Sequence, residues 1–458
     1  MAASSPIVEQ RARINGSEGS LFALLCALLA SACSGGGPAV IAATARSAAS
    51  APAAPLPSSN AGLNNRLVMG YQGWFGCPGD FDGNALWVHW FTGAPAANHL
   101  LVDMLPATDG MALDDLCDTG LIKQNGAPLR LFSSQNANVV DWHFRLMAQQ
   151  GVGAVALERF VVELNDDGHK RRVDNVLRNV IQAAEDSGLP FFLSYDVSGA
   201  DPVTVVQTIR QDWRYLAAQF GLTSGKAYLQ DGGKPVLELW GFGFAENPGT
   251  ADEVLLLTAD LKAGNDGLQS VTLIGGIPSD WRTLQGDSKT DAAWTAVYLG
   301  YDVLSPWMVG RFDSEDAASR FYDQTIAPDL ALVQSMGLRY LPVIFPGFSR
   351  YNLMLALGDP AQAIVNQIPR NCGNFIWQQS YLLLSHGIDM AYGAMFDELD
   401  EGTAVLPAES TKAGFPPEAQ GVYLDEDGCT LASDWYVTVM GRIAGNFTAG
   451  TVPSLPLQ

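Results

Sequence analysis

The amino-acid sequence predicts a (β/α)8 barrel, the TIM-barrel form of the α/β class. Eight short runs are almost continuously apolar, which is typical of parallel strands that are buried on both faces. Helix-length segments separate these runs, and eight such units fit a closed barrel better than a doubly wound sheet. No shorter internal repeat is evident, which argues against a solenoid. The chain has 458 residues, of which 48% are hydrophobic, and this is enough for one large barrel.

The order of elements follows from the apolar runs and the helical patterns between them. The eight predicted strands are 67–74, 152–160, 190–197, 235–241, 270–278, 302–309, 340–346 and 390–396. Helical patterns cover 139–149, 172–187, 202–220, 251–263 and 315–336, and a last helix at 433–444 closes the eighth unit. The sequence thus predicts one catalytic domain over residues 62–450.

The N-terminal segment has the features of an export signal. Arg11 and Arg13 precede an apolar run at 21–32 that is too short to span a bilayer. Residues 29–33 (LASAC) resemble a bacterial lipobox, which would make Cys33 the lipidated first residue of the mature protein. The alternative is a plain signal peptide cut near Ala32. We expect a signal peptide over 1–33, a flexible Ala/Pro/Ser linker over 34–61 and location in the cell envelope, at the periplasm or outer membrane. Membrane attachment would be only through this lipid.

Composition and charge restrict the partners of the protein. The formal net charge is −22, so the surface repels phosphate backbones, and nucleic acid is not an expected partner. Eleven Trp and 13 Tyr residues suit an oligosaccharide or polysaccharide substrate, because sugars pack their apolar faces on aromatic rings. We expect a monomer.

Export determines how the cysteines are interpreted. Cys77, Cys117, Cys372 and Cys429 lie beyond the leader, and in an oxidising compartment they can form two disulfides with three possible connectivities. None has the spacing of a zinc site. We therefore expect neither a metal nor another cofactor.

The eighth predicted strand ends in the acidic cluster Asp397, Glu398, Asp400 and Glu401. Crowded carboxylates repel one another, which raises some pKa values and leaves others low. One protonated acid beside one ionised base is what cleavage of a glycosidic bond requires. Glu398 and Glu401 are three residues apart, a spacing that turns both to one side of a helical turn, and they are the catalytic candidates. A solvated acidic turn or a Ca²⁺ or Mg²⁺ site remains the alternative.

Binding candidates collect where the other strands end, because barrel active sites form at that face. A glycine-rich tract at 70–80 predicts a tight loop that brings Trp74 and His89 over a ligand, although a core-packed loop is the alternative. Glu158 and Arg159 fit a structural pair as well as a substrate contact. No GxSxG elbow occurs, which leaves carboxylate chemistry. The predicted substrate-binding residues are Tyr71, Trp74, His89, Trp90, Asp196, Trp240, Trp307, Arg311 and Asp397.

Five tracts resemble a known family. They are GYQGWFGCPGD (70–80), GKPVLELWGFGF (233–244), SPWMVGR (305–311), LPVIFPGFS (341–349) and ELDEGT (398–403). Between residues 67 and 444 the chain resembles the glycoside hydrolase family 71/99-like barrel proteins of the xylosidase/arabinosidase type. More distantly, it resembles the family 99 endo-α-mannosidases.

The resemblance implies a mechanism. Family 99 enzymes carry E-W-H-E-G-T at this strand end and are retaining and metal-independent. One Glu deprotonates the sugar 2-hydroxyl, which attacks the anomeric carbon, and the other acts as acid and then base. This implies that Glu398 is the base and Glu401 the acid/base.

The chain departs from the family pattern inside this motif. Leu399 and Asp400 stand where the family has Trp and His, and Asp397 stands where Asn is usual, so the resemblance does not extend to mannosidase specificity. Without 2-hydroxyl participation, the same Glu pair would serve a conventional double displacement. The alternative function is a non-catalytic surface glycan-binding lipoprotein on the same barrel.

Overall fold

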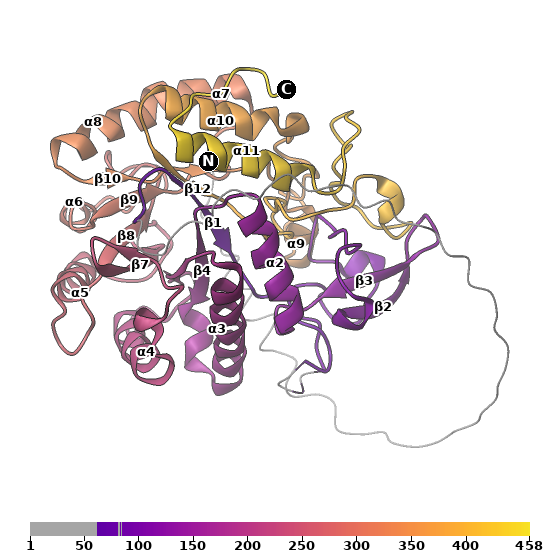
Figure 1. The fold of residues 1–458 in the computed structure, drawn as a ribbon, viewed down its shortest axis with the longest axis horizontal. Helices are drawn as coiled ribbons and strands as arrows, with labels where there is room; N and C mark the ends of the chain where they lie inside the picture. The colour runs from indigo at the N-terminus through magenta and orange to yellow at the C-terminus, as the bar shows by residue number, and fades with distance from the viewer. Residues whose placement is uncertain (1–61, 81–82, 84) are drawn as a thin grey trace.

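A single curled sheet forms the centre of the computed structural model, which describes residues 62–80, 83 and 85–458 (Figure 1). In the described chain nine parallel strands pair in the order β10-β9-β8-β7-β5-β4-β1-β12-β11, and β6 (Gln230–Asp231) pairs antiparallel with β7. The predicted signal peptide, Cys33 and linker lie outside the described residues. The parallel strands are β1 (Arg66–Tyr71), β4 (Ala154–Phe160), β5 (Phe191–Asp196), β7 (Lys234–Trp240), β8 (Thr272–Ile277), β9 (Val303–Pro306), β10 (Arg339–Tyr340), β11 (Val343–Ile344) and β12 (Met390–Gly393).

The two ends of this sheet belong to one extended segment. Only Leu341 and Pro342 separate β10 from β11. The Leu341 N–H donates to the carbonyl of Leu304 on β9 at 2.8 Å, and the Pro342 carbonyl accepts from the N–H of Tyr392 on β12 at 3.0 Å. The segment thus joins β9 to β12 and acts as one strand, interrupted where proline lacks a donor. The predicted (β/α)8 barrel with eight strands is confirmed.

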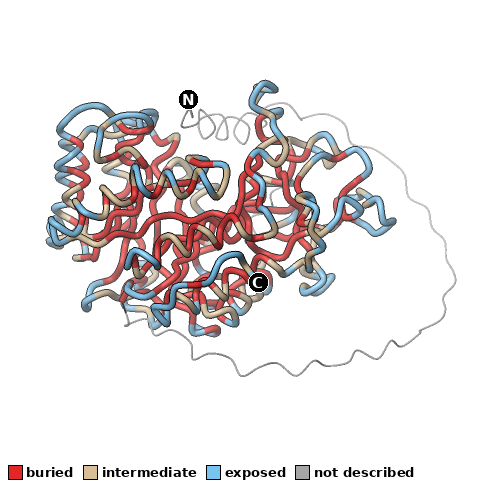
Figure 2. Tube along the Cα trace, turned by 90° about the horizontal axis from the view of Figure 1, so that it is seen from above, coloured by how far each residue is buried: buried red, intermediate tan, exposed pale blue. Residues whose placement is uncertain are grey.

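Helices surround the barrel and separate its strands along the chain (Figure 1). Five predicted helical segments and the C-terminal helix are present. Figure 2 shows that buried chain runs through the centre while exposed chain lies on the outside. The prediction missed α6 (Trp294–Tyr298), α9 (Tyr351–Ala356) and α10 (Asn374–Ser385). The predicted helices are α2 (Ala137–Gln149), α3 (Asp167–Ser187), α4 (Val205–Phe220), α5 (Ala251–Ala263), α7 (Glu315–Phe321) with α8 (Ala327–Ser335), and α11 (Trp435–Ala449).

The helix ends follow local chemistry, as α5 illustrates. Thr250 accepts from the Glu253 N–H, and the Glu253 side chain accepts from the Thr250 N–H, which together form a capping box. The helix ends at Gly264, whose φ of 76° is the left-handed conformation that glycine adopts without a steric penalty. These signals explain why the predicted range 251–263 matches the observed helix.

Two long loops cover one side of the barrel. The loop 72–136, between β1 and α2, contains the antiparallel hairpin of β2 (Leu116–Ile122) and β3 (Pro128–Phe132), which the prediction missed. The loop 394–434, between β12 and α11, packs against it. For example, the Ala107 N–H donates to the Pro407 carbonyl at 2.9 Å. The two loops therefore form one covering layer.

Disulfides tie down both loops. Cys77 is bonded to Cys117 within the first loop, and Cys372 is bonded to Cys429 of the second loop. This pairing selects one of the three connectivities that the sequence left open. Within the described part of the chain, no helix is both long enough and apolar enough to cross a membrane.

Candidate active site

Along each strand, side chains that point outward to the helices alternate with side chains that point into the barrel. Arg159 on β4 points outward, where it binds Asp174 on α3 and Asp212 on α4, each at 2.7 Å. Tyr195 on β5 also points outward and donates to Asp212 at 2.8 Å. Because side chains alternate along a strand, the preceding residues of both strands face the barrel interior. Arg159 is therefore part of the framework between barrel and helices.

A row of three interior residues forms what we call the barrel floor: Glu158 on β4, Ser194 on β5 and Glu238 on β7. Ser194 is opposite Glu158 on one side and Glu238 on the other. All three are buried, and Glu238 is 1% exposed. Burial raises the pKa of Glu238 to about 7. Burial also raises the pKa of Glu158 well above its ordinary value, and the nearby carboxylates, first that of Asp196, add to the rise.

Glu398 lies beside this floor and has two oriented partners. Gln72 Nε2, just beyond β1, donates to Glu398 Oε1 at 2.9 Å, and Thr403 Oγ1 donates to Oε2 at 2.7 Å. Glu398 is 5% exposed, and its charge adds to the raised pKa of Glu158. Hydrogen bonds to both carboxylate oxygens fix its orientation. The β1 end and the turn after β12 thus jointly position the predicted base.

The turn that carries Glu398 and Glu401 is held on both sides by backbone hydrogen bonds. The N–H groups of Asp103 and Met104 both donate to the Leu399 carbonyl at 3.0 Å. On the other side, the Ser349 N–H donates to the Glu401 carbonyl at 2.9 Å. The Glu401 side chain is partly exposed, whereas Glu398 is buried. In the predicted pair, the carboxyl group of Glu398 is therefore enclosed, and that of Glu401 is in contact with solvent.

Asp397 has a different environment from its neighbour Glu398. Its two carboxylate oxygens accept the backbone N–H groups of Gln72 at 2.7 Å and Gly73 at 2.9 Å, and it is fully buried. Burial raises its pKa to about 7, although both backbone hydrogen bonds oppose the rise. Asp397 therefore anchors the end of β12 to the end of β1, a position that does not fit the predicted contact with substrate.

Above the floor lies an aromatic rim, which we define as Trp240, Trp307 and Tyr392. The Trp307 ring makes edge-to-face contacts with Trp240 at 5.2 Å and with Tyr392 at 6.2 Å between ring centroids. The Trp240 ring lies over Gly276 of β8, where any side chain would meet it. Both tryptophans are partly exposed. Aromatic rings above a few convergent polar groups are a common pattern in small-ligand sites.

The structure brings several predicted residues together at the interior. The pKa of Tyr392 is raised by burial first, and then by the charges of Glu158, Glu238, Glu398 and Asp196. Asp196, whose Oδ1 accepts from the Ser198 N–H at 2.6 Å, therefore shares one space with the predicted base and the floor. Trp240 and Trp307 border the same space through the rim. Four predicted residues therefore lie around one space: Asp196, Glu398, Trp240 and Trp307.

Three other predicted binding residues are held by contacts with protein, and their predicted contact with substrate stays a prediction. Tyr71 faces outward, and its hydroxyl lies 3.0 Å from His143 Nδ1 on α2. Trp90 is fully buried and donates to the Phe132 carbonyl at 3.0 Å. Arg311 forms an ion pair with Asp287, which also accepts the Ser279 and Asp280 N–H groups. Aromatic and cationic side chains near a strand end serve packing as readily as binding, and the sequence does not separate the two uses.

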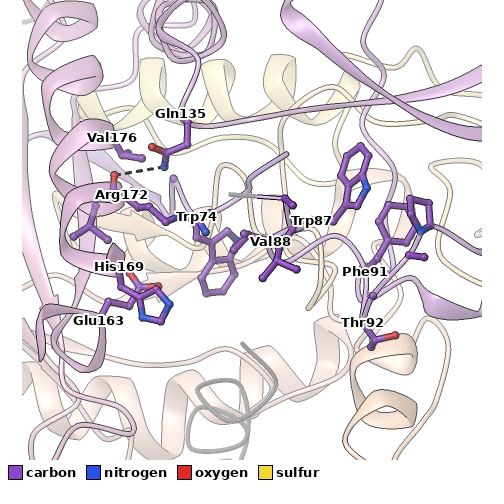
Figure 3. A pocket seen from close by; sticks show the side chains of 17 residues that line it. Trp74, Trp87, Val88, Phe91, Thr92, Gln135, Glu163, His169, Arg172 and Val176 are labelled. Atoms are coloured by element: carbon purple, nitrogen blue, oxygen red, sulfur yellow. Dashed lines mark hydrogen bonds between the residues drawn. The ribbon is translucent and has the colours of Figure 1, made fainter. Parts of the chain in front are cut away.

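Trp74, whose ring packs on that of His89, borders the larger of two described cavities. The two rings are stacked, with centroids 4.3 Å apart and planes 9° apart. The cavity is about 400 Å³. In Figure 3, Trp74 lies between a group of Glu163, His169 and Arg172 and the aromatic side chains of Trp87 and Phe91. The labelled lining of the cavity includes Trp74, Trp87, Val88, Phe91, Thr92, Gln135, Glu163, His169, Arg172 and Val176.

A second, smaller cavity connects this region to the floor. It is about 20 Å³, and its lining includes Gln72, Trp74, Glu158 and Glu163. Gln72 also binds Glu398, so one residue contacts both the cavity and the predicted base. Burial raises the pKa of Glu163 to about 7, against the opposing charges of Arg172 and Arg159. The large cavity is thus adjacent to the carboxylates through a short chain of contacts.

The alternative that the acidic turn binds a cation requires several side-chain ligands around one point. In the part of the chain that the structure describes, no group of three or more His, Cys, Asp or Glu residues is placed to hold a metal ion. Two of the turn's carboxylates, those of Asp397 and Glu398, are already directed at protein donors.

Sequence reasoning left four contributors to the site outside its candidates: Gln72, Ser194, Glu238 and Thr403. Glu238 gave a usable signal, because an acidic residue inside an otherwise apolar strand is costly unless it serves a purpose. Glu158 gave the same signal, but its neighbour Arg159 made a simple ion pair equally reasonable. Gln72 and Thr403 gave none, since uncharged polar residues are ordinary in loops.

The fold and the site together define the class of protein: a (β/α)8 barrel with buried carboxylates and aromatic rings at the carboxyl ends of its strands, as in barrel-type glycoside hydrolases. Solved structures specify the architecture further. The chain is similar to the GH99 endo-α-mannosidase from Bacteroides thetaiotaomicron, with a TM-score of 0.58, 15% sequence identity and coverage of 85% of this chain and 99% of that one.

Two more structures agree. The same mannosidase in complex with BIS-TRIS propane has a TM-score of 0.57 at 15% identity, with 84% of this chain and 98% of that chain covered. A glycoside hydrolase-like protein has a TM-score of 0.50 at 15% identity, with 85% and 97% covered. No protein-family model matches the sequence, and a search of curated proteins gives no significant match. At this identity the likeness establishes the fold, which confirms that the chain has a GH99-like glycoside hydrolase fold.

Proposed function

We propose that this protein is an exported glycoside hydrolase that cleaves a glycan by a retaining mechanism, with Glu398 and Glu401 as its catalytic pair. One observation carries the proposal. Glu398 is buried at the carboxyl end of a barrel strand with both oxygens hydrogen-bonded, while Glu401, three residues later on the same anchored turn, is partly exposed. The fold likeness to GH99 endo-α-mannosidase supports the same assignment.

In the proposed reaction the two carboxyl groups have separate tasks. Glu398 takes the proton of the sugar 2-hydroxyl, whose oxygen attacks the anomeric carbon as the glycosidic bond breaks. Glu401 gives its proton to the leaving oxygen, and then takes a proton from the water that opens the intermediate, while Glu398 returns its proton to the sugar 2-oxygen. In a double displacement Glu398 would attack the anomeric carbon itself. Both routes retain the anomeric configuration.

The neighbouring cavity extends the proposal to the substrate. Trp74 borders the 400 Å³ cavity, which continues toward Glu158 and Gln72 through the smaller one. We assign this cavity to further sugar units of an oligosaccharide or polysaccharide, because sugar ring faces pack on indole and polar side chains of the wall, such as Gln135 and Arg172, can bind hydroxyl groups. The chain would then act as a monomer on a glycan that extends beyond the cleaved bond.

Export and lipid attachment remain part of the proposal. Two disulfides, Cys77–Cys117 and Cys372–Cys429, support an oxidising compartment. The lipobox-like residues before Cys33 support attachment to the cell envelope. A Cys33→Ser chain that stays in the membrane fraction as fully as its parent would contradict lipid attachment.

The decisive experiment is a turnover screen of the exported protein on α- and β-linked oligosaccharides, with Glu398→Gln and Glu401→Gln measured in parallel. We expect each substitution to lower kcat by about 10²- to 10⁴-fold, the contribution of a positioned acid or base. Glu409→Gln is the matched control, since Glu409 lies in the same loop but pairs with Lys123. A substrate with a 2-deoxy sugar distinguishes the routes, because only double displacement would turn it over.

The glycan-binding alternative predicts a different result. It requires binding of an oligosaccharide, no turnover by the parent protein and unchanged affinity in Glu398→Gln and Glu401→Gln. That combination would overturn the hydrolase proposal.

A further inference from the structure

Several buried polar atoms at the barrel interior lack protein partners. Among the described residues, both carboxylate oxygens of Glu238, the hydroxyl of Ser194 and the indole N–H of Trp240 have no hydrogen-bond partner. Ser194 lies close enough to oppose the raised pKa of Glu238, yet the two side chains do not meet hydrogen-bond geometry. Buried polar groups are almost always paired, so a cluster of unpaired ones indicates that another molecule supplies the partners.

These three groups converge on one place. Ser194 and Glu238 are opposite each other on β5 and β7, and Trp240 is two residues further along β7, on the same face. The Trp240 ring occupies the space that Gly276 leaves free on β8. Tyr392 experiences the charges of both Glu238 and Glu398. The unpaired groups therefore border the same interior space as the proposed base.

The donor and acceptor types select the chemistry of the missing partner. The indole N–H of Trp240 only donates, so it needs an acceptor, which a protonated amine cannot supply. An anionic ligand would be repelled by the carboxylates of Asp196 and Glu398, which lie around the same space. A hydroxyl group both donates and accepts, and so satisfies a carboxyl group, a serine and an indole together.

We propose that Glu238, Ser194 and Trp240 bind adjacent hydroxyl groups of the sugar ring on which Glu398 acts, and that Glu238 selects this sugar. The inference rests on the proposed function and specifies its substrate: a neutral sugar whose hydroxyls reach below the rim. A sugar without the matching hydroxyl would leave the buried carboxyl group unpaired, which is a strong basis for rejecting it. The pKa of about 7 supports this role, since a protonated carboxyl group both donates and accepts.

The test measures binding in a Glu401→Gln background, which prevents turnover. The probes are trisaccharides of xylose, arabinose, mannose and glucose in α and β linkage, and the cationic trisaccharide of glucosamine, titrated by calorimetry at about pH 6, below the pKa of Glu238. We expect Glu238→Leu to weaken binding of the preferred neutral trisaccharide by at least about tenfold, and Glu238→Gln by about threefold or less, since the amide still donates and accepts. Ser194→Ala should weaken it less than Glu238→Leu.

Two controls separate contact from folding. Tyr301→Phe removes another buried, unpaired hydroxyl, but one whose ring lies against Gly275 on the opposite face of β8 from Gly276, and it should leave binding unchanged. Monodeoxy analogues of the preferred sugar supply the second control. If the contact is direct, one analogue binds the parent weakly and loses nothing more in Glu238→Leu.

Each remaining outcome decides the proposal. Equal affinity in Glu238→Leu and its parent, or no saccharide binding at all, would overturn it. It would also fail if only the glucosamine trisaccharide bound and Glu238→Gln lost as much as Glu238→Leu, because charge would then be the basis of recognition. Turnover with an unchanged KM in Glu238→Leu would refute the inference and leave the hydrolase standing. If the parent binds a saccharide through Glu238 but does not turn it over, the hydroxyl-binding role of Glu238 would stand and the hydrolase proposal would fail.

Discussion

At the scale of residues, Glu158 and Arg159 show how one strand serves both the site and the framework. Glu158 faces the interior among other carboxylates, whereas Arg159 faces outward between two helices. Arg159 is 2% exposed, and its ion pairs with Asp174 and Asp212 neutralise charges that would otherwise be buried alone. Buried pairs of this kind stabilise a fold mainly because removing one partner is costly.

We therefore expect Arg159→Ala to lower the free energy of unfolding by about 3–5 kcal/mol, since it leaves Asp174 and Asp212 buried without their guanidinium. Denaturant unfolding measures this. Arg145→Ala is the matched control: Arg145 is exposed and pairs with Asp141 one helical turn away, so its loss should cost less than about 0.5 kcal/mol. Similar losses in the two variants would mean that Asp212 finds enough compensation from Lys170 and Tyr195.

At the scale of elements, the covering layer of loops 72–136 and 394–434 decides where the proposed catalytic turn lies. The Leu399 carbonyl is held by Asp103 and Met104 of the first loop, so the turn is fixed by a segment almost 300 residues away in sequence. The disulfide Cys372–Cys429 ties the second loop to the segment before α10, and Cys77–Cys117 closes the first. Cross-links in long loops limit the freedom of the unfolded chain.

Removal of Cys372–Cys429, by substitution of both residues with Ser, should lower the free energy of unfolding by about 2–4 kcal/mol, because 57 residues separate the cysteines. Calorimetric melting of the oxidised protein and the variant measures this. The exported parent should lose stability when a thiol reductant is added, and the double variant should lose less. A parent insensitive to reductant would contradict a structural role for both disulfides.

At the scale of the whole molecule, the high negative charge and the buried carboxyl groups make the fold more stable under mildly acidic conditions. The net charge is −22, and several carboxyl groups are buried in positions that disfavour ionisation. Burial raises the pKa of Asp397 and Glu238 to about 7, and the pKa of Asp103 and Asp329 to about 6. Each of these groups holds its proton more tightly in the folded than in the unfolded protein.

We expect the melting temperature to fall as the pH rises from about 4 to about 8. Between the unfolded and folded pKa values the folded state binds more protons, so the free energy of unfolding decreases with increasing pH across this window. Melting measured at constant ionic strength checks the sign. Glu238→Gln removes one of these groups and should reduce the slope, whereas a melting temperature that rises toward pH 8 would contradict the account.

The sequence by itself determined the succession of elements and indicated the turn that we propose to be catalytic. All eight strands appeared as mainly apolar runs, because burial on both faces favours apolar residues locally. Helical patterns located helices such as α5, and the carboxylates after the eighth run indicated the proposed catalytic turn. These features depend on residues that are neighbours in the chain, so composition and spacing reveal them.

Only the tertiary structure decided which side of each strand faces the site. A strand that is apolar on both faces has no alternation from which the inward side can be read, so Tyr71 and Glu238 were equally eligible as ligand contacts. Tyr71 proved to pack against His143 of α2, and Glu238 proved to lie in the barrel floor. The cysteine pairing and the contact of Gln72 with Glu398 likewise join distant segments. Such contacts exist only once the barrel closes, because closure alone sets the register between strands.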